Sequence, residues 1–230
     1  GSGDSSDLSF RDLDLIGGKV TQSNNNSISS IDVLISKNIA SDDSILRIGY
    51  GAVLATYRFD KYKTKKVKVS LPKAIKIFSK SHQSLSKQFI HKKSVAEGVF
   101  LARDLVNEPS NILNPEDYAR RIKTLSSYGL KIEVLNETKM KKLGMDSLLG
   151  VGRGSQYDSQ LVIMKWEGIK NKKTKPLCFV GKGVCFDSGG ISLKPGNKME
   201  EMIGDMGGSA AVVGLMKSLA LRKAKANVIG

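Results

Sequence analysis

Residues 177–220 of this chain read LCFVGKGVCFDSGGISLKPGNKMEEMIGDMGGSAAVVGLMKSLA. The apolar start predicts a strand over residues 177–181. A glycine-rich loop follows the strand, and after it comes a pattern of small and apolar residues that is typical of a helix. The loop and the start of the helix carry four charged side chains: Lys182, Asp187, Lys194 and Asp205. Because open α/β folds build their sites at the carboxyl ends of strands, we expect the functional site here.

The residue types in this loop suit a metal site. Carboxylates such as Asp187 and Asp205 are oxygen ligands of the kind that divalent cations take. Lys182 could bind a cation only as the neutral amine, a form that a nearby dication favours because it penalises the ammonium. Lys194 lies in a second bend, where a lysine that keeps its proton could stabilise an oxyanion forming on a carbonyl.

Each of these residues also has an ordinary structural interpretation, which spacing alone favours. Asp205 could be the N-cap of the following helix. Residues 187–190 could form a plain turn, and Lys182 could be a solvated loop lysine. The GVGRG run at residues 150–154 does not complete a dinucleotide-binding fingerprint, so we interpret it as a loop.

Helical patterns alternate with short apolar runs along the rest of the chain. This alternation predicts an α/β protein. We expect helices over residues 45–58, 91–107, 115–128 and 137–142, and strands over 131–135, 161–166, 177–181 and 227–229. Residues 31–35 are expected as a short buried strand or the end of a helix. Asn114 is a good N-cap and Pro115 suits a first helical position. Residues 4–44 show little other pattern, and residues 170–175 are expected as a hairpin or loop between two strands.

Composition limits the partners that we expect. The formal net charge is +15, from 37 Lys and Arg against 22 Asp and Glu. Lysines are spread over many segments without interleaved aromatic residues, which favours a solvated surface over a nucleic-acid partner. No apolar run is long enough to span a bilayer, so no membrane partner is expected. The two cysteines, Cys178 and Cys185, are interpreted as buried free thiols.

Several long motifs together resemble one enzyme family. The stretches VGKGVCFDSGGISLKP (residues 180–195) and DMGGSAAVVG (205–214) closely resemble the leucyl aminopeptidase (cytosol aminopeptidase) family of dinuclear metallopeptidases. The match also includes GAVLATYRFDKYKTKK (51–66), ARDLVNEPSNILNPEDYA (102–119) and LGMDSLLGVGRGS (143–155). It therefore covers the chain from about Gly51 onwards.

The resemblance implies roles for five residues. Lys182, Asp187 and Asp205 would be metal ligands for two divalent ions (manganese, zinc or magnesium), with Asp187 bridging them. Lys194 would be the catalytic lysine, and Met202 would line the pocket for the first side chain of the substrate. The family is cytoplasmic and forms homo-hexamers. Its members remove N-terminal leucine and other apolar residues from peptides, using a water activated between the two ions.

One family motif does not occur in these 230 residues. It is an Asn-Thr-Asp-Ala-Glu-Gly-Arg run that supplies two further acidic ligands and an arginine holding a bicarbonate proton carrier. We therefore expect a partial chain, as we also infer from the strand at residues 227–229, which would otherwise be an unpaired edge. Residues 1–90 would form a smaller, partial N-terminal α/β domain. Residues 91–230 would form a connector helix and the first part of a catalytic domain, a mixed sheet flanked by helices.

The alternative to an enzyme is a family-related scaffold that binds nucleic acid or has another non-catalytic role. The high net charge and the missing motif are the features that favour it.

Overall fold

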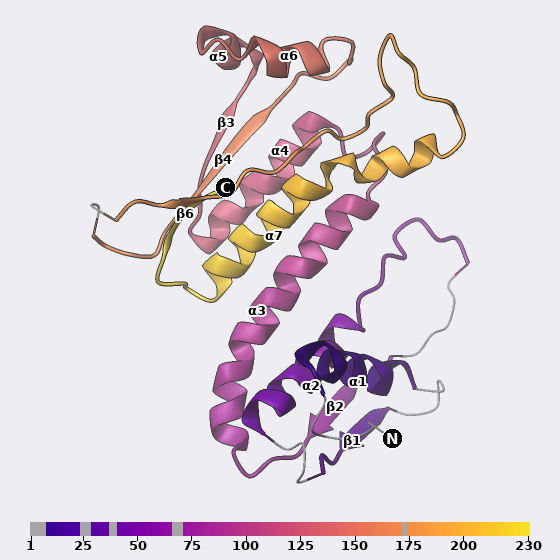
Figure 1. Cartoon of the computed structure of the whole chain (residues 1–230), viewed down its shortest axis with the longest axis vertical. Coiled ribbons are helices and arrows are strands. Elements are labelled where there is room, and N and C mark those ends of the chain that lie inside the picture. The colour runs from indigo at the N-terminus through magenta and orange to yellow at the C-terminus, as the bar shows by residue number, and fades with distance from the viewer. Residues whose placement is uncertain (1–7, 24–28, 37–40, 66–70, 172–173) are drawn as a thin grey trace. The chain divides into compact units, whose positions relative to one another are not determined.

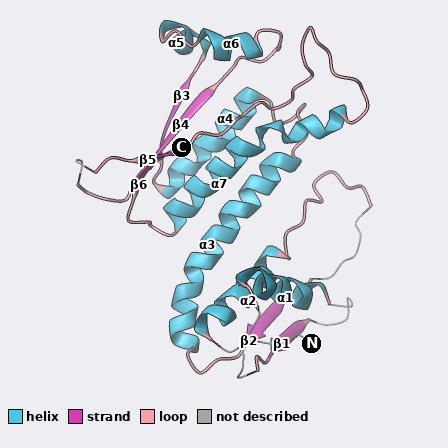
Figure 2. Ribbon diagram, in the orientation of Figure 1, coloured by secondary structure: helices cyan, strands magenta, loops and turns pink. Residues whose placement is uncertain are grey.

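The computed structural model of the chain describes residues 8–23, 29–36, 41–65, 71–171 and 174–230. Residue 66 of the motif at 51–66 and residues 172–173 of the expected hairpin or loop lie outside the described residues. The chain divides into two compact units, Gly1–Ala96 and Glu97–Gly230, and helix α3 (His82–Asn107) contributes to both (Figure 1). Each unit combines helices with a sheet (Figure 2), so the predicted α/β class is confirmed.

The first unit is a small α/β structure. Besides the start of α3, it contains α1 (Phe10–Gln22), β1 (Ser30–Val33), α2 (Asp42–Leu54) and β2 (Ala74–Ile77). Strands β1 and β2 pair in parallel, with Ser30 opposite Ala74. The expected strand at residues 31–35 does form in part, but it is not buried, and Leu34 just beyond it is 83% exposed. A sheet of two strands, the number that the described residues provide, leaves its strands open to solvent.

Two helices of this unit differ from expectation. Helix α1 was not predicted, because Gly17 and Gly18 in its interior weaken the helical pattern. It begins at a capping box, in which Ser9 accepts from the backbone N–H of Asp12 and the Asp12 carboxylate accepts from that of Ser9. Helix α3 begins at His82 rather than at residue 91, because Leu85 is buried in a core cluster that stabilises the extra turns.

The second unit contains most of the described strands. After the end of α3 it comprises α4 (Pro115–Lys123), the 3₁₀ helix η3 (Thr124–Tyr128), β3 (Lys131–Leu135), α5 (Glu137–Lys142), α6 (Asp146–Gly152), β4 (Leu161–Glu167), β5 (Leu177–Cys178), the 3₁₀ helix η4 (Met199–Met206), α7 (Gly207–Leu221) and β6 (Asn227–Ile229). The four-stranded sheet has the order β3-β4-β6-β5. Strand β4 pairs antiparallel with β3 and β6, and β5 pairs parallel with β6, which makes the sheet mixed.

This topology corrects two expectations and decides a third. Strand β6 is not an unpaired edge, because it lies between β4 and β5. Of the two forms expected for residues 170–175, the hairpin is excluded, since the strands on either side both pair with β6 and not with each other. Strand β5 is shorter than predicted and ends at Cys178, so the backbone that carries the charged loop leaves the sheet early.

Local signals set the ends of several elements. Asn114 is the N-cap of α4, and its side-chain oxygen accepts the N–H of Asp117 at 2.9 Å, as predicted. The helical segment ends at Gly129, which has a φ of 91°. The GVGRG run was wrongly interpreted as a loop, because Gly150 and Gly152 belong to α6.

Helices α3, α4 and α7 run alongside one another in the second unit (Figure 1). Their apolar faces and the sheet form one core, whose fully buried members include Leu113, Met206, Val213 and Met216. Helices α3 and α7 are in close contact at a pair of glycines: a Cβ added to Gly98 would lie 2.3 Å from the carbonyl oxygen of Gly214. In the described part of the chain, no helix is both long and apolar enough to cross a membrane.

The glycine contact between α3 and α7 gives a testable prediction. Replacing Gly with Ala inside a helix ordinarily stabilises it by ~0.5–1 kcal/mol. For Gly98→Ala we expect the opposite sign, a loss of ~1–3 kcal/mol in the free energy of unfolding, because the new methyl group forces the helices apart. Urea denaturation measures this change.

Gly150→Ala is the matched control. Gly150 is also helical, but no atom lies within 4 Å of an added Cβ. Its replacement should therefore leave stability unchanged or raise it. Equal stability of the two variants would contradict the close approach of α3 and α7.

Candidate functional site

The charged loop joins the sheet to helix α7. It leaves β5, extends away without regular structure, and returns through η4 to α7 (Figure 1). Lys182, Asp187 and Lys194 lie in the loop, and Asp205 lies near the end of η4. The structure brings the four residues together as two lysine–aspartate pairs.

The backbone before Lys182 is pressed against the start of α7. A Cβ on Gly181 would lie 2.5 Å from the carbonyl oxygen of Gly208, so no larger residue fits there without a shift. The carbonyl oxygen of Lys182 also accepts the backbone N–H of Ser209 at 2.9 Å. Because of these contacts, Lys182 on the strand side is held close to the helix side, where Asp205 lies.

Lys182 and Asp205 form the first pair. The Nζ atom of Lys182 lies 2.8 Å from Oδ1 of Asp205, and this hydrogen bond is the main reason that the pKa of Lys182 is raised. The other oxygen of Asp205, Oδ2, is buried and finds no hydrogen-bond partner in the described part of the chain. A buried carboxylate oxygen without a partner is costly, which makes it a candidate position for a bound cation.

Asp187 and Lys194 form the second pair. The Nζ atom of Lys194 lies 2.9 Å from Oδ2 of Asp187, donates to the Asp187 carbonyl oxygen at 2.9 Å, and faces Sδ of Met202 at 3.2 Å. The hydrogen bond from Lys194 and then that from the Gly189 N–H lower the pKa of Asp187. The charge of Lys182 contributes as well, so the two pairs are close enough to act on each other.

The structure tests the ordinary structural interpretations of Asp205, residues 187–190 and Lys182. Asp205 is not the N-cap of α7, because that position is Met206 and no side chain caps the helix. The turn at residues 187–190 is real, since Oδ1 of Asp187 accepts the N–H of Gly189 at 2.9 Å. Lys182 is well exposed, as a solvated lysine would be, but it is also paired.

The two cysteines differ from expectation in burial. Both thiols are free, but Cys178 is exposed, because it lies in β5 at the end of the strand order and so on an edge of the described sheet. Cys185 packs against the core, and burial raises its pKa to about 11.

The donor atoms fit a divalent cation in part. Carboxylate oxygens together with a nitrogen suit cations such as zinc and manganese. Within the described ranges, however, no three or more His, Cys, Asp and Glu side chains gather. Asp187 and Asp205 could therefore hold a cation only together with Lys182, or with ligands that these residues do not supply.

Two residues near the site were missed by sequence reasoning. Tyr118 on α4 and Ser209 on α7 are hydrogen-bonded through their hydroxyl oxygens at 2.9 Å. They are 91 positions apart in the chain, in two separate motifs, and no periodicity links them. The contact is visible only once α4 and α7 are packed together.

Two family models together match most of this chain. The catalytic-domain model of the cytosol aminopeptidase family matches residues 100–230, and the N-terminal-domain model of that family matches residues 1–66. The chain belongs to the cytosol aminopeptidase family. The resemblance stated from its motifs is therefore confirmed, and so is the expected pairing of a smaller N-terminal α/β part with a second, mixed-sheet part.

Individual family members agree with this assignment. A probable cytosol aminopeptidase of Caulobacter vibrioides is 50% identical over 199 residues, which are 86% of this chain and 40% of the relative. That of Nitrobacter winogradskyi is 49% identical over 219 residues, 94% of this chain and 43% of the relative. The chain thus spans less than half the length of these curated relatives.

Solved structures show the same fold. The bottromycin maturation enzyme BotP in complex with Mn superposes with a TM-score of 0.83 at 28% identity, covering 97% of this chain and 47% of BotP. A second structure of BotP gives a TM-score of 0.84 at 28% identity, covering 100% of this chain and 48% of BotP. The manganese is that of the BotP complex.

The difference between the two thiols gives a prediction. With a pKa of about 11, Cys185 is thiolate in roughly one molecule in a thousand at pH 8. Iodoacetamide at pH 8 should therefore alkylate Cys178 of the 230-residue chain first, as peptide mass spectrometry would report. Labelling of Cys185 should rise with pH as the thiolate forms. Both thiols should react alike in the urea-unfolded chain, and equal rates in the folded chain would contradict the burial of Cys185.

Proposed function

We propose that this protein is a metal-dependent aminopeptidase that releases N-terminal leucine and other apolar residues from peptides. Membership of the cytosol aminopeptidase family supports an aminopeptidase. The observation that carries the metal is the buried, unpartnered Oδ2 of Asp205 beside Lys182, with a second lysine–aspartate pair close by. The nucleic-acid scaffold has the net charge of +15 in its favour, but the described residues add no structural feature that supports it.

Three residues would hold the cations in this proposal. Asp205 and Lys182 would bind one ion, and Asp187 would bridge to a second, with manganese, zinc or magnesium as the candidates. Two divalent ions in such a site supply an activated water and Lewis-acid polarisation of the scissile carbonyl. In the absence of ions, Lys182 is held as an ammonium by Asp205, so it must lose a proton before its amine can serve as a ligand.

Lys194 would stabilise the developing negative charge on the substrate carbonyl. An ammonium has three hydrogens, and here they face Oδ2 of Asp187, the carbonyl oxygen of Asp187 and Sδ of Met202. A thioether is the weakest acceptor of the three. Lys194 could therefore donate the hydrogen that faces Met202 in a hydrogen bond to a substrate oxygen. The two hydrogen bonds to Asp187 that fix the lysine would stay intact.

Met202 would also contact the substrate's first side chain. Its thioether lies beside the ammonium of Lys194, so an apolar side chain packed on Met202 would place the adjacent carbonyl near that lysine. A homo-hexamer, a cytoplasmic location and a bicarbonate proton carrier belong to this proposal by family resemblance. The arginine that would hold the bicarbonate has no counterpart in these residues.

Lys194→Ala tests the proposed role of the lysine. The protein, produced at the length that its gene encodes, should release leucine from leucyl-p-nitroanilide, and the substitution should lower kcat/KM by roughly 10²–10³-fold, as loss of an oxyanion donor does. A chelator should abolish the activity, and added Mn²⁺ should restore it.

Lys142→Ala is the matched control, because Lys142 is an exposed lysine at the end of α5. It should leave kcat/KM unchanged. Activity that survives chelation, or that Lys194→Ala does not reduce, would overturn the mechanism. Strongly salt-dependent DNA binding without leucine release would favour the scaffold instead.

A further inference from the structure

Ser209 connects the two backbone segments that carry the first lysine–aspartate pair. Its N–H donates to the carbonyl oxygen of Lys182 at 2.9 Å, on the strand side of the site. Its hydroxyl donates to the carbonyl oxygen of Met206 at 2.8 Å, on the helix side, next to Asp205. One residue thus fixes both segments at the place where Nζ of Lys182 and Oδ1 of Asp205 lie 2.8 Å apart.

Tyr118 completes the hydrogen bonds of Ser209. The serine hydroxyl has a single hydrogen, which it gives to Met206, so its oxygen must accept from the Tyr118 hydroxyl at 2.9 Å. Burial raises the pKa of Tyr118 to about 12, so the phenol keeps the proton that it donates at neutral pH. The tyrosine therefore fixes the orientation of the serine hydroxyl.

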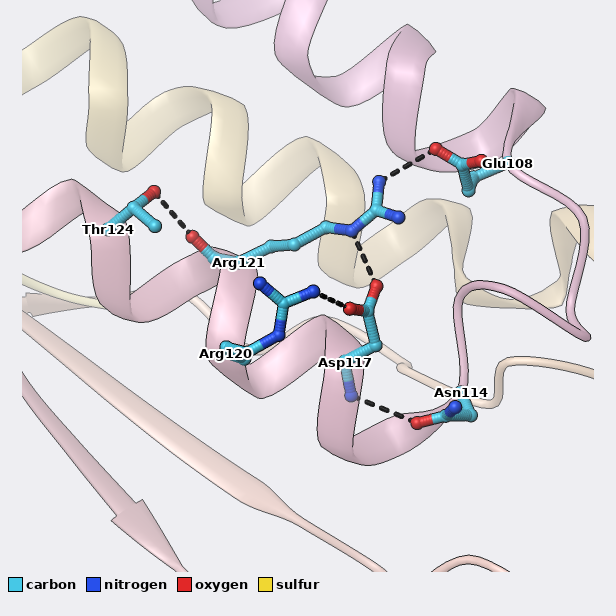
Figure 3. Close-up of polar contacts among 6 residues, drawn as sticks. All are labelled: Glu108, Asn114, Asp117, Arg120, Arg121 and Thr124. Carbon is cyan, nitrogen blue, oxygen red and sulfur yellow. Dashed lines mark hydrogen bonds and ion pairs between the residues drawn. The ribbon is translucent and has the colours of Figure 1, made fainter.

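Tyr118 is itself held in place. Its side chain is 5% exposed and lies in the core cluster, and Cys185 of the charged loop packs against the same cluster. Arg121 on the next turn of α4 bonds to Asp117 at 2.6 Å and to Glu108 at 2.7 Å (Figure 3). Glu108 is 3% exposed, so α4 cannot rotate without breaking a partly buried ion pair.

We propose that Tyr118 and Ser209 are positioning residues, which hold Lys182 and Asp205 at the separation at which both can bind one divalent cation. The inference rests on the proposed function. Neither hydroxyl touches the cation or the substrate in this arrangement. They act through the backbone, and the buried, unpartnered Oδ2 of Asp205 marks the position that they prepare.

Tyr118→Phe tests the inference with little disturbance of packing, because only the hydroxyl is removed. In the protein at its gene-encoded length, we expect the affinity for Mn²⁺, measured by calorimetry without substrate, to fall about 10-fold or more, as loss of an outer-shell partner does. The double variant with Ser209→Ala should lose no more affinity than Ser209→Ala alone, since the two residues act in one chain of hydrogen bonds. Tyr128→Phe, at a tyrosine that is 44% exposed, is the control and should bind Mn²⁺ as the wild type does.

The possible outcomes separate this inference from the proposed function. If the wild type binds Mn²⁺ and Tyr118→Phe binds it equally well, the positioning role is wrong and the metal site stands. Equal affinity together with a lower urea midpoint would show that the hydroxyl only stabilises the fold. If the wild type binds none of Mn²⁺, Zn²⁺ and Mg²⁺ in the same calorimetric measurement, the proposed function fails and this inference with it. Should Ser209→Ala not fold, Tyr118→Phe decides alone.

Discussion

The site depends on a close backbone contact between two glycine residues. Gly181, just after β5, and Gly208, at the start of α7, lie so close that a side chain on the first would collide with the carbonyl of the second. Without that contact, the loop could not bring Lys182 to Asp205, because the chain between them makes a long excursion. The glycines thus determine where the charges meet, although they carry no charge themselves.

When no cation is bound, the lysine and the aspartate of each pair neutralise one another's charge. Each ammonium lies within 3 Å of a carboxylate oxygen, at 2.8 Å and 2.9 Å, which lowers the cost of holding four charges in one loop region. A cation that enters must compete with these lysines for the acids. Lys194 and Lys182 differ in this respect, because Lys194 has two further acceptors and Lys182 is largely exposed. Lys182 is the easier of the two to release.

The sequence predicts what depends on short-range patterns. The N-cap at Asn114, the stop at Gly129 and the strand at Lys131–Leu135 all follow from neighbours within a few residues, and the structure has each of them. Long family motifs also placed the four charged residues in one region. Pairing of distant segments could not be predicted in this way: the position of β6 inside the sheet depends on partners far away in the chain. The hydrogen bond between Tyr118 and Ser209 could not be predicted for the same reason. The residues near each of them in the sequence give no sign of the other.

The strand order has a consequence for how the protein is made. Strand β5 pairs with β6, which comes later in the chain than η4 and α7, and Phe179 donates to the carbonyl oxygen of Ile229 at 2.8 Å. During translation, therefore, the segment that leads into the charged loop lacks its partner strand among the described residues until residues 227–229 have left the ribosome. Lys182 and Asp205 are synthesised before that point. A nascent chain that stalls shortly before residue 227 would hold all four charged residues, with β3 and β4 able to pair but β5 without β6.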